Sequence, residues 1–436
     1  MKSEARADTG IVARQVAVRI YRAVLDERRT LDDLFEHDDA VKQLEIRDRA
    51  FLNNLLRTVF RHMGEIEQVK SKHLAKPLPR KSGSAGDILT LAIAQLLFLD
   101  TPPHAAIDSA VRMAKVDRNA THFSGLINAV LRKVAATSRE DLKGLNTGQV
   151  NTPAWLWERW RNAYSADLAE TIARSHALEP ALDIAVKSDA AGWAETLGGT
   201  LLPTGQIRLL AHRGLVTALQ GFESGEWWVQ DAAAGLPVLL LGDLRGKTAL
   251  DLCAAPGGKT MQLAAAGARV TAVDHSSVRL KRLHENLDRT RLTATVIESD
   301  VLSLAMADRF DAVLLDAPCS ATGTIRRHPE LPYIRQPSQM TELCATQRMM
   351  LAEAADRVKP GGSLVYCTCS LEPEEGEKQI SWFRAAYPNF KLVEPGPAIP
   401  RNLVSNSGWL RLHPAMTIGE CAGLDGFFIA RLDRAS

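Results

Sequence analysis

The apolar positions in the first third of the chain repeat with the period of an α-helix. Near the start, apolar side chains recur every four residues at Val12, Val16, Ile20 and Val24. Further apolar segments with helical spacing or length lie at residues 52–60, 88–99, 105–114 and 126–134. Side chains three and four positions apart share one helix face, and none of these segments alternates as a strand does. The pattern therefore predicts an all-α domain over residues 1–140.

The pattern changes between residues 141 and 235. A helix is expected after Pro153, because proline is favoured in the first helical turn. Two short runs, residues 182–186 and 206–211, have strand character and are separated by Gly and Pro. We interpret residues 141–235 as a small α+β insert. Trp227 and Trp228 could stack on bases there, although core packing is the more common role of paired tryptophans.

From residue 236 onward, strand and helix patterns alternate. The predicted strands are residues 248–253, 269–274, 293–298, 311–315, 362–369 and 426–432. Helices are predicted between them, notably at residues 277–287 and 342–358. This alternation is typical of an α/β fold with a doubly wound, mostly parallel sheet, in which ligands bind at the carboxyl ends of the strands. We assign residues 236–436 to such a domain.

Composition narrows the class of protein. The chain has 436 residues, 46% apolar and 24% charged, as in ordinary globular proteins. We identify no signal peptide and no apolar run long enough to span a bilayer. Six cysteines fit no disulfide framework in so long a chain, so we expect a reducing, cytoplasmic location. A net charge of +2 gives no argument for a nucleic-acid partner.

One segment is nevertheless locally basic. Residues 68–86 contain no acidic residue, and prolines and glycines predict an exposed loop. Its cations are Lys70, Lys72, Lys76, Arg80 and Lys81. A solvated charged loop is the simpler interpretation, and contact with a phosphate backbone is the alternative.

The first predicted strand of the α/β domain leads into a glycine-rich loop at residues 251–260. Gly257 and Gly258 allow the backbone to approach a ligand at the start of a helix. Asp274 ends the second strand, where a carboxylate can accept hydrogen bonds from both ribose hydroxyls of a nucleoside. Asp300 follows the third strand, where an adenine amine could be met. These positions favour a nucleoside-bearing cofactor.

A P-loop is the rival interpretation, because Gly258-Lys259-Thr260 has the ending of one. The P-loop pattern requires glycine at position 253, where this chain has Cys253. Residues 314–316 could still imitate the acidic strand that holds magnesium. We favour a cofactor without a triphosphate, and S-adenosylmethionine is the leading candidate.

Two cysteines follow the fourth and fifth predicted strands, Cys319 in Pro-Cys-Ser and Cys369 in Thr-Cys-Ser. Carbon 5 of a pyrimidine is a poor nucleophile, and a thiolate that adds to carbon 6 activates it for methylation. Asp316 could hydrogen-bond the edge of the base. The competing interpretations are small buried thiols or a metal site at Cys367 and Cys369, for which no further ligand pair is present. We predict no metal.

Four motifs together resemble the RNA (cytosine-5) methyltransferases. They lie at residues 251–260, 316–330, 366–375 and 425–428. Residues 94–106 and 128–132 are similar to the NusB helical RNA-binding fold. A NusB-like domain ahead of this catalytic domain resembles the layout of enzymes that methylate 16S ribosomal RNA. The resemblance implies 16S ribosomal RNA as partner. We also expect a monomer and no membrane association.

The resemblance also implies roles for single residues. It assigns the nucleophile to Cys369 and the release step to Cys319, with Asp316 as the third catalytic residue. The cofactor contacts that it implies are Cys253, Ala254, Ala255, Pro256, Gly257, Gly258, Lys259, Asp274, Asp300 and Asp316. Cys367 departs from the family pattern and places a second thiol near the nucleophile.

Two other functions stay open on the sequence. The chain could be an RNA-binding ribosome-assembly factor with an inactive methyltransferase fold, although Cys369, Cys319 and Asp316 are all present. DNA cytosine methyltransferases attack from the Pro-Cys pair instead, and the Thr-Cys-Ser element disfavours that assignment.

Overall fold

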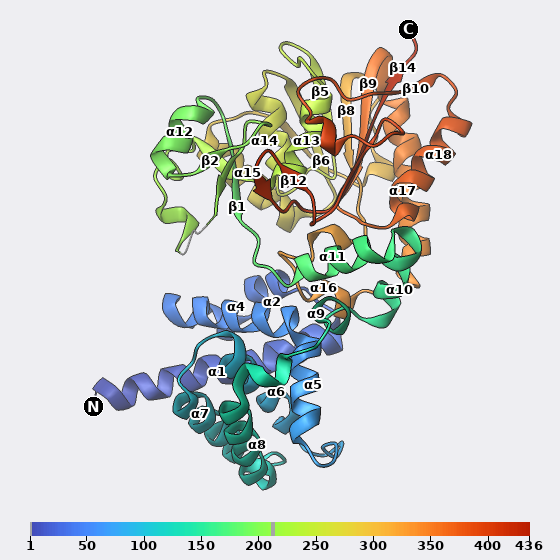
Figure 1. Ribbon diagram of the computed structural model, residues 1–436. Coiled ribbons are helices and arrows are strands. Elements are labelled where there is room, and N and C mark those ends of the chain that lie inside the picture. Colours follow the sequence, from blue (N-terminus) through green and yellow to red (C-terminus); the bar gives the residue numbers. More distant parts are fainter. Residues whose placement is uncertain (1, 211–213) are drawn as a thin grey trace. The chain divides into compact units, whose positions relative to one another are not determined.

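The computed structural model describes residues 2–210 and 214–436 (Figure 1). The chain forms two compact units. One comprises Met1–Leu178 with Ile325–Arg335, and the other comprises Glu179–Thr324 with Gln336–Ser436. No helix among the described residues has the length and apolar character needed to cross a membrane.

The first unit is helical, as the periodicity predicts. Its longer helices are α1 (Lys2–Glu27), α4 (Ile46–Arg61), α5 (Met63–His73), α6 (Ala85–Phe98), α7 (Pro103–Val116), α8 (Ser124–Thr137), α10 (Ala154–Ala163) and α11 (Ala166–His176). Short helices are α2 (Leu31–His37), α3 (Asp39–Lys42) and α9 (Thr147–Val150). Ten of the fourteen residues of α6 are buried, which makes it the central helix of the unit. Pro103 lies in the first turn of α7, where its missing N–H costs no hydrogen bond.

The loop in the basic segment is shorter than the sequence predicts, because it begins only after His73. Helix α5 continues to His73, so Lys70 and Lys72 lie on a helix and the prediction of a loop from residue 68 is wrong for them. Lys70 pairs with Glu67, and Lys72 lies 2.6 Å from Asp141. Each of these two lysines is therefore paired with an acidic residue of the same unit.

The segment Ile325–Arg335, with helix α16 (Leu331–Ile334), packs within the helical unit, although it directly follows strand β8 and its loop, which belong to the second unit. The Leu31 N–H donates to Glu330 Oε1 at 3.2 Å, and the Tyr333 hydroxyl donates to the Asn151 carbonyl at 3.0 Å. Ile325 and Leu331 are buried. The motif at residues 316–330 is thus divided between the two units.

The second unit is built on one large sheet. Its strands are β5 (Thr248–Leu252), β6 (Arg269–Asp274), β7 (Thr295–Glu298), β8 (Phe310–Asp316), β9 (Val358–Thr368), β10 (Phe390–Val393), β11 (Leu410–Leu412) and β14 (Phe427–Arg434). The order is β10-β14-β9-β8-β5-β6-β7, with β11 paired to β14. Strands β5 to β9 are parallel, and β14 is antiparallel to β9 and β10. The predicted mostly parallel α/β sheet is confirmed.

Helices cover both faces of this sheet (Figure 1). Helices α13 (Ala232–Leu240), α14 (Gly258–Ala265) and α15 (Ser277–Thr290) lie on one face, and α17 (Gln339–Asp356) and α18 (Glu377–Ala386) on the other. Because side chains alternate along a strand, Leu314 packs on the α13 side, whereas Val313 and Leu315 pack against α17. Burial on both faces explains why β8 is an unbroken apolar run.

A small antiparallel sheet belongs to the same unit. It has the order β2-β3-β1-β4 and consists of β1 (Leu182–Val186), β2 (Thr200–Leu201), β3 (Ile207–Leu209) and β4 (Trp227–Val229), with helix α12 (Ala190–Leu197). A separate hairpin pairs β12 (Thr417–Ile418) with β13 (Cys421–Ala422). The strand predicted at 206–211 is observed at Ile207–Leu209, and Ala211 lies outside the described residues.

Trp227 and Trp228 are core residues. Trp227 packs with Ile184 and Ile207 inside the small sheet, whereas Trp228 packs with Leu283 of α15 on its other side. Both are at most 2% exposed. Neither indole can stack on a base, so core packing is the correct interpretation.

Candidate active site

The topology brings the predicted site residues to one edge of the large sheet. Strand β5 lies between β6 and β8. The chain runs outward from β5 through β6 to β7 and then returns to β8 on the other side of β5. Such a switch point opens a crevice at the carboxyl ends of the strands. Cys253 follows β5, Asp316 ends β8, and Cys369 follows β9.

The loop after β5 is shaped by two residues with left-handed backbone. Cys253 has φ +62° and Gly257 has φ +107°. At Gly257 a Cβ would also lie 3.3 Å from the Leu283 Cγ, so glycine suits this position. Between them lie only Ala254, Ala255 and Pro256 before α14 begins at Gly258. Small side chains therefore leave the backbone at the start of α14 open to close approach.

Asp316 lies between a cation and a thiol. Lys259 Nζ lies 2.8 Å from Asp316 Oδ2, and the Cys367 thiol donates to Asp316 Oδ1 at 3.4 Å. The Lys259 side chain is 11% exposed and that of Asp316 is 30% exposed. Asp316, together with other nearby acidic groups, outweighs burial and raises the pKa of Lys259, which is therefore charged. Burial and Asp316 raise the pKa of Cys367 well above its usual value, so this extra thiol stays protonated.

The two strand-end cysteines meet. Cys319 Sγ lies 3.5 Å from Cys369 Sγ, and both residues are half-buried. The hydrogen bond with Cys369, together with burial and the charge of Glu375, raises the pKa of Cys319 well above its usual value. A thiol in this environment keeps its proton at neutral pH.

A buried acid supports the loop after β5 from below. Thr260 donates to Asp251 Oδ2 at 2.6 Å, and the second oxygen of Asp251 has no hydrogen-bond partner among the described residues. Burial raises the pKa of Asp251 to about 7. The sequence marked Asp251 only as the start of a motif.

Comparisons with known proteins identify the family. Residues 238–433 match the family described as 16S rRNA methyltransferase RsmB/F, and residues 12–136 match the NusB family. Ribosomal RNA small subunit methyltransferase B of Sodalis glossinidius is 34% identical over 96% of this chain and 97% of its own. The same-named protein of Serratia proteamaculans is 36% identical over 88% of this chain and 92% of its own. The chain belongs to the RsmB/F methyltransferase family.

A solved structure agrees with this assignment. The crystal structure of PH0851 superposes with a TM-score of 0.74 at 25% identity and covers 98% of both chains. The predicted family resemblance and the NusB-like helical fold are thus confirmed. As a member of the RsmB/F family, the protein is an enzyme that uses S-adenosylmethionine.

The acids predicted at two strand ends are held in place by backbone N–H groups. Asp274 accepts hydrogen bonds from the Ala255 and Ser276 N–H groups at 3.1 and 3.0 Å, which fixes its carboxylate at the end of β6. Asp300 is exposed and accepts from the Leu302 N–H at 2.9 Å. Carboxylate oxygens accept more than one hydrogen bond, so both acids keep acceptor capacity.

Glu375 is a residue of the site that the sequence did not single out. Its carboxylate is buried and accepts hydrogen bonds from Ser320, Gln347 and Ser370. One signal in the sequence could have indicated it. Each candidate cysteine is followed by a serine, and acidic residues that could bind these serines, among them Glu375, follow Ser370.

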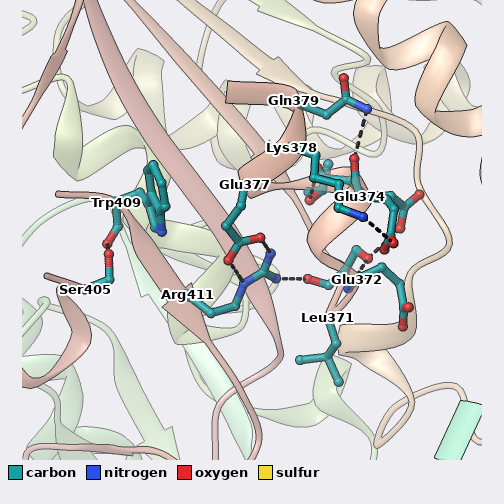
Figure 2. A network of polar contacts seen from close by, with 12 residues as sticks. Leu371, Glu372, Glu374, Glu377, Lys378, Gln379, Ser405, Trp409 and Arg411 are labelled. Carbon is teal, nitrogen blue, oxygen red and sulfur yellow. Dashed lines mark hydrogen bonds and ion pairs between the residues drawn. The ribbon is translucent and has the colours of Figure 1, made fainter. Parts of the chain in front are cut away.

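A second missed residue fixes the segment after Cys369. Arg411 of β11 faces Glu377 of α18 in a two-pronged ion pair (Figure 2), and its Nε lies 2.8 Å from Glu377 Oε1. A third guanidinium nitrogen donates to the Ser370 carbonyl at 2.6 Å. The planar fork of arginine suits such a paired contact. Nothing in the sequence linked Arg411 to the cysteines, because 41 residues separate Arg411 from Ser370.

Proposed function

We propose that this enzyme transfers the methyl group of S-adenosylmethionine to carbon 5 of a cytosine in 16S ribosomal RNA through a covalent cysteine adduct. The contact that carries the proposal is the 3.5 Å distance between Cys319 Sγ and Cys369 Sγ beside Asp316. The relatives named ribosomal RNA small subunit methyltransferase B support the choice of RNA. One thiol suffices for attack on carbon 6 of a pyrimidine. A second thiol has a role when the hydrogen on carbon 5 must also be removed as a proton.

Cys369 is the proposed nucleophile. The raised pKa of Cys319 makes that residue a protonated thiol, which is a poor nucleophile but a hydrogen-bond donor to the neighbouring sulfur. The Cys369 proton leaves to solvent, and the resulting thiolate bonds to carbon 6 of the cytosine. The electron pair of the C5–C6 double bond then becomes available at carbon 5.

Asp316 is proposed to meet the edge of the base. Attack at carbon 6 places negative charge on the ring nitrogen at position 3, and that nitrogen must take a proton. The Asp316 carboxyl group, held by Lys259 at 2.8 Å, can transfer this proton from solvent to the ring.

Cys319 is proposed to act in release. After methylation, carbon 5 carries both its hydrogen and the new methyl group. Cys319 first loses its own proton to solvent, and its thiolate then takes the hydrogen from carbon 5 as a proton. The C5–C6 double bond re-forms, and the bond from carbon 6 to Cys369 breaks. Cys319 is thereby restored to its resting thiol, Cys369 takes up a proton from solvent, and the ring nitrogen loses the proton that it gained.

S-adenosylmethionine supplies the electrophilic methyl group. The residues proposed to hold it are Cys253, Ala254, Ala255, Pro256, Gly257, Gly258, Lys259, Asp274, Asp300 and Asp316. Asp274 would accept from the ribose hydroxyls and Asp300 from the adenine amine, while the small residues before α14 leave room for close approach.

The substrate cytosine must leave its stack before Cys369 can reach carbon 6, which is easiest in single-stranded or partly assembled RNA. We propose that residues 1–140, which include the match to the NusB family, contribute to RNA binding.

The test is methyl transfer from labelled S-adenosylmethionine to 16S ribosomal RNA. We expect Cys369→Ala to lose activity by at least about a thousandfold, because the variant lacks the attacking group. Cys421→Ala is the matched control, since Cys421 is a buried thiol of β13, in the hairpin with β12. Bisulfite mapping of the product would locate the modified cytosine. Normal activity in Cys369→Ala, or methylation at a position other than carbon 5, would contradict the proposal.

A further inference from the structure

The two cysteines are each followed by a serine, and both serines bind the same carboxylate. The Ser320 N–H donates to Glu375 Oε1 at 2.9 Å, and the Ser320 hydroxyl donates to Glu375 Oε2 at 2.5 Å. The Ser370 hydroxyl also donates to Oε2. Cys319 and Cys369 lie 50 positions apart in the chain, yet both adjacent serines are bound to one acidic residue.

The carboxylate itself is held in place. Gln347 of α17 donates to Glu375 Oε1 at 3.0 Å and to the Pro318 carbonyl at the same distance. The Glu375 carbonyl accepts from the Tyr366 hydroxyl at 2.8 Å, which ties the residue to the end of β9. Both Glu375 and Gln347 are fully buried. A buried carboxylate with four donors is rigid, because every lost hydrogen bond leaves charge unsolvated.

The sulfur separation depends on these contacts. Each cysteine is one residue from a serine whose position Glu375 sets, and the two serine hydroxyls lie 3.2 Å apart. The Ser370 carbonyl is fixed from another direction, because it accepts a hydrogen bond from the Arg411 guanidinium at 2.6 Å. The Gly323 N–H donates to the Cys369 carbonyl at 3.0 Å and completes the connection between the two loops.

We propose that Glu375 is the positioning residue of the site, which holds Cys319 and Cys369 close enough for one sulfur to attack carbon 6 of a base while the other removes the proton from carbon 5 of the same base. It touches neither substrate nor cofactor in this role and acts through Ser320 and Ser370. The inference rests on the proposed function, since only a two-cysteine mechanism needs both sulfurs at one base.

Two substitutions separate the geometry from the charge. Glu375→Gln can keep all four contacts, because its amide oxygen accepts from the Ser320 N–H and Gln347, and its amide nitrogen donates to the two serine oxygens. Glu375→Ala removes all four. Glu374→Ala is the matched control, because the Glu374 side chain pairs with Lys378 at the surface.

The first readout needs no RNA. A trivalent arsenical that binds only neighbouring thiol pairs is titrated into the full-length protein, and Cys319→Ala supplies the baseline. We expect wild type, Glu374→Ala and Glu375→Gln to bind it above that baseline, whereas binding by Glu375→Ala falls to the baseline. Undiminished binding by Glu375→Ala would overturn the inference.

The second readout is steady-state methyl transfer. We expect Glu375→Ala to lower kcat about a hundredfold, the scale of an ångström-sized misplacement of catalytic groups, with KM for S-adenosylmethionine within about twofold. Glu375→Gln should stay within about fivefold of wild type. If the arsenical results are as expected but neither wild type nor any variant transfers methyl groups to 16S ribosomal RNA, the proposed function fails while the positioning of the two thiols by Glu375 stands. If Glu375→Ala does not fold, Ser320→Ala and Ser370→Ala each test the same contacts, and unchanged kcat in both would overturn the inference.

Discussion

The surroundings of Cys319 keep its thiol protonated. Cys319 and Cys369 are both half-buried, with their sulfur atoms 3.5 Å apart, and the hydrogen bond with Cys369, burial and Glu375 all raise the pKa of Cys319. The same sulfur that is unsuited to attack as a thiol becomes a strong base once it loses its proton. Release, and not attack, should therefore depend on the ionisation of Cys319.

This assignment predicts a pH dependence of adduct breakdown. The thiolate fraction of Cys319 rises with pH as long as pH stays below its raised pKa, so release should accelerate by up to about tenfold per pH unit between pH 6.5 and 8.5. Single-turnover decay of the protein–RNA adduct measures it. Decay in Cys319→Ala should be slow and flat with pH, and a flat profile in the wild type would argue against Cys319 as the base.

At the scale of elements, the site depends on loops that approach one another without side chains between them. The Gly426 N–H donates to the Gly323 carbonyl at 2.8 Å, which joins the loop after β8 to the start of β14. A Cβ at Gly323 would lie 1.9 Å from the Gly426 carbonyl oxygen. Backbone cannot move away cheaply, so glycine is required at Gly323 for this close contact.

Gly323→Ala should consequently destabilise the protein by about 1–3 kcal/mol, the usual cost of overpacking, and lower methyl transfer, because the Cys369 carbonyl is bound by the Gly323 N–H. Thermal unfolding and initial rates measure the two effects. Gly396→Ala is the control, since a Cβ there meets nothing within 4 Å, and it should change stability by less than about 0.5 kcal/mol. Equal melting temperatures for the two variants would contradict the packing argument.

Periodicity predicted the elements well because burial patterns are local. Strand β8 is apolar on both faces, and its apolar run predicts a strand at residues 311–315, which the structure extends by one residue at each end to Phe310–Asp316. The site was only partly predictable. Cys319, Cys369 and Asp316 follow strands and so could be placed at one sheet edge, but Glu375 and Arg411 act through contacts that depend on how loops fold back. The run of cations at residues 70–81 does not show where a loop begins, because helix α5 continues through Lys70 and Lys72.

At the scale of the whole molecule, the chain leaves the second unit, which contains the large sheet, after Thr324 and returns to it at Gln336. The intervening segment is held among helices of the first unit, where Arg57 donates to the Arg327 carbonyl and Arg61 to the Arg326 carbonyl at 3.0 Å. Its apolar residues Ile325, Leu331 and Ile334 are buried there. Without residues 1–178, this segment would lack the helices that cover it.

A fragment of residues 179–436 should therefore be cut by trypsin after Arg326, Arg327 or Arg335 much faster than the full chain, because proteolysis follows local opening. Time-resolved mass spectrometry of limited digests measures the rates. Cleavage after Arg245, whose side chain is 83% exposed, is the internal control and should be equal in both. Equal cleavage of residues 325–335 in fragment and full chain would show that the helical unit does not protect the segment.

The division of roles between the two cysteines is tested most directly by trapping the covalent adduct. Purified Cys319→Ala and Cys369→Ala are each incubated with 16S ribosomal RNA and S-adenosylmethionine, resolved on a denaturing gel, and the cross-linked peptide is sequenced. We predict that Cys319→Ala accumulates an adduct attached through Cys369 and that Cys369→Ala forms none. An adduct in Cys369→Ala attached through Cys319 would show that the roles are reversed and would contradict the mechanism.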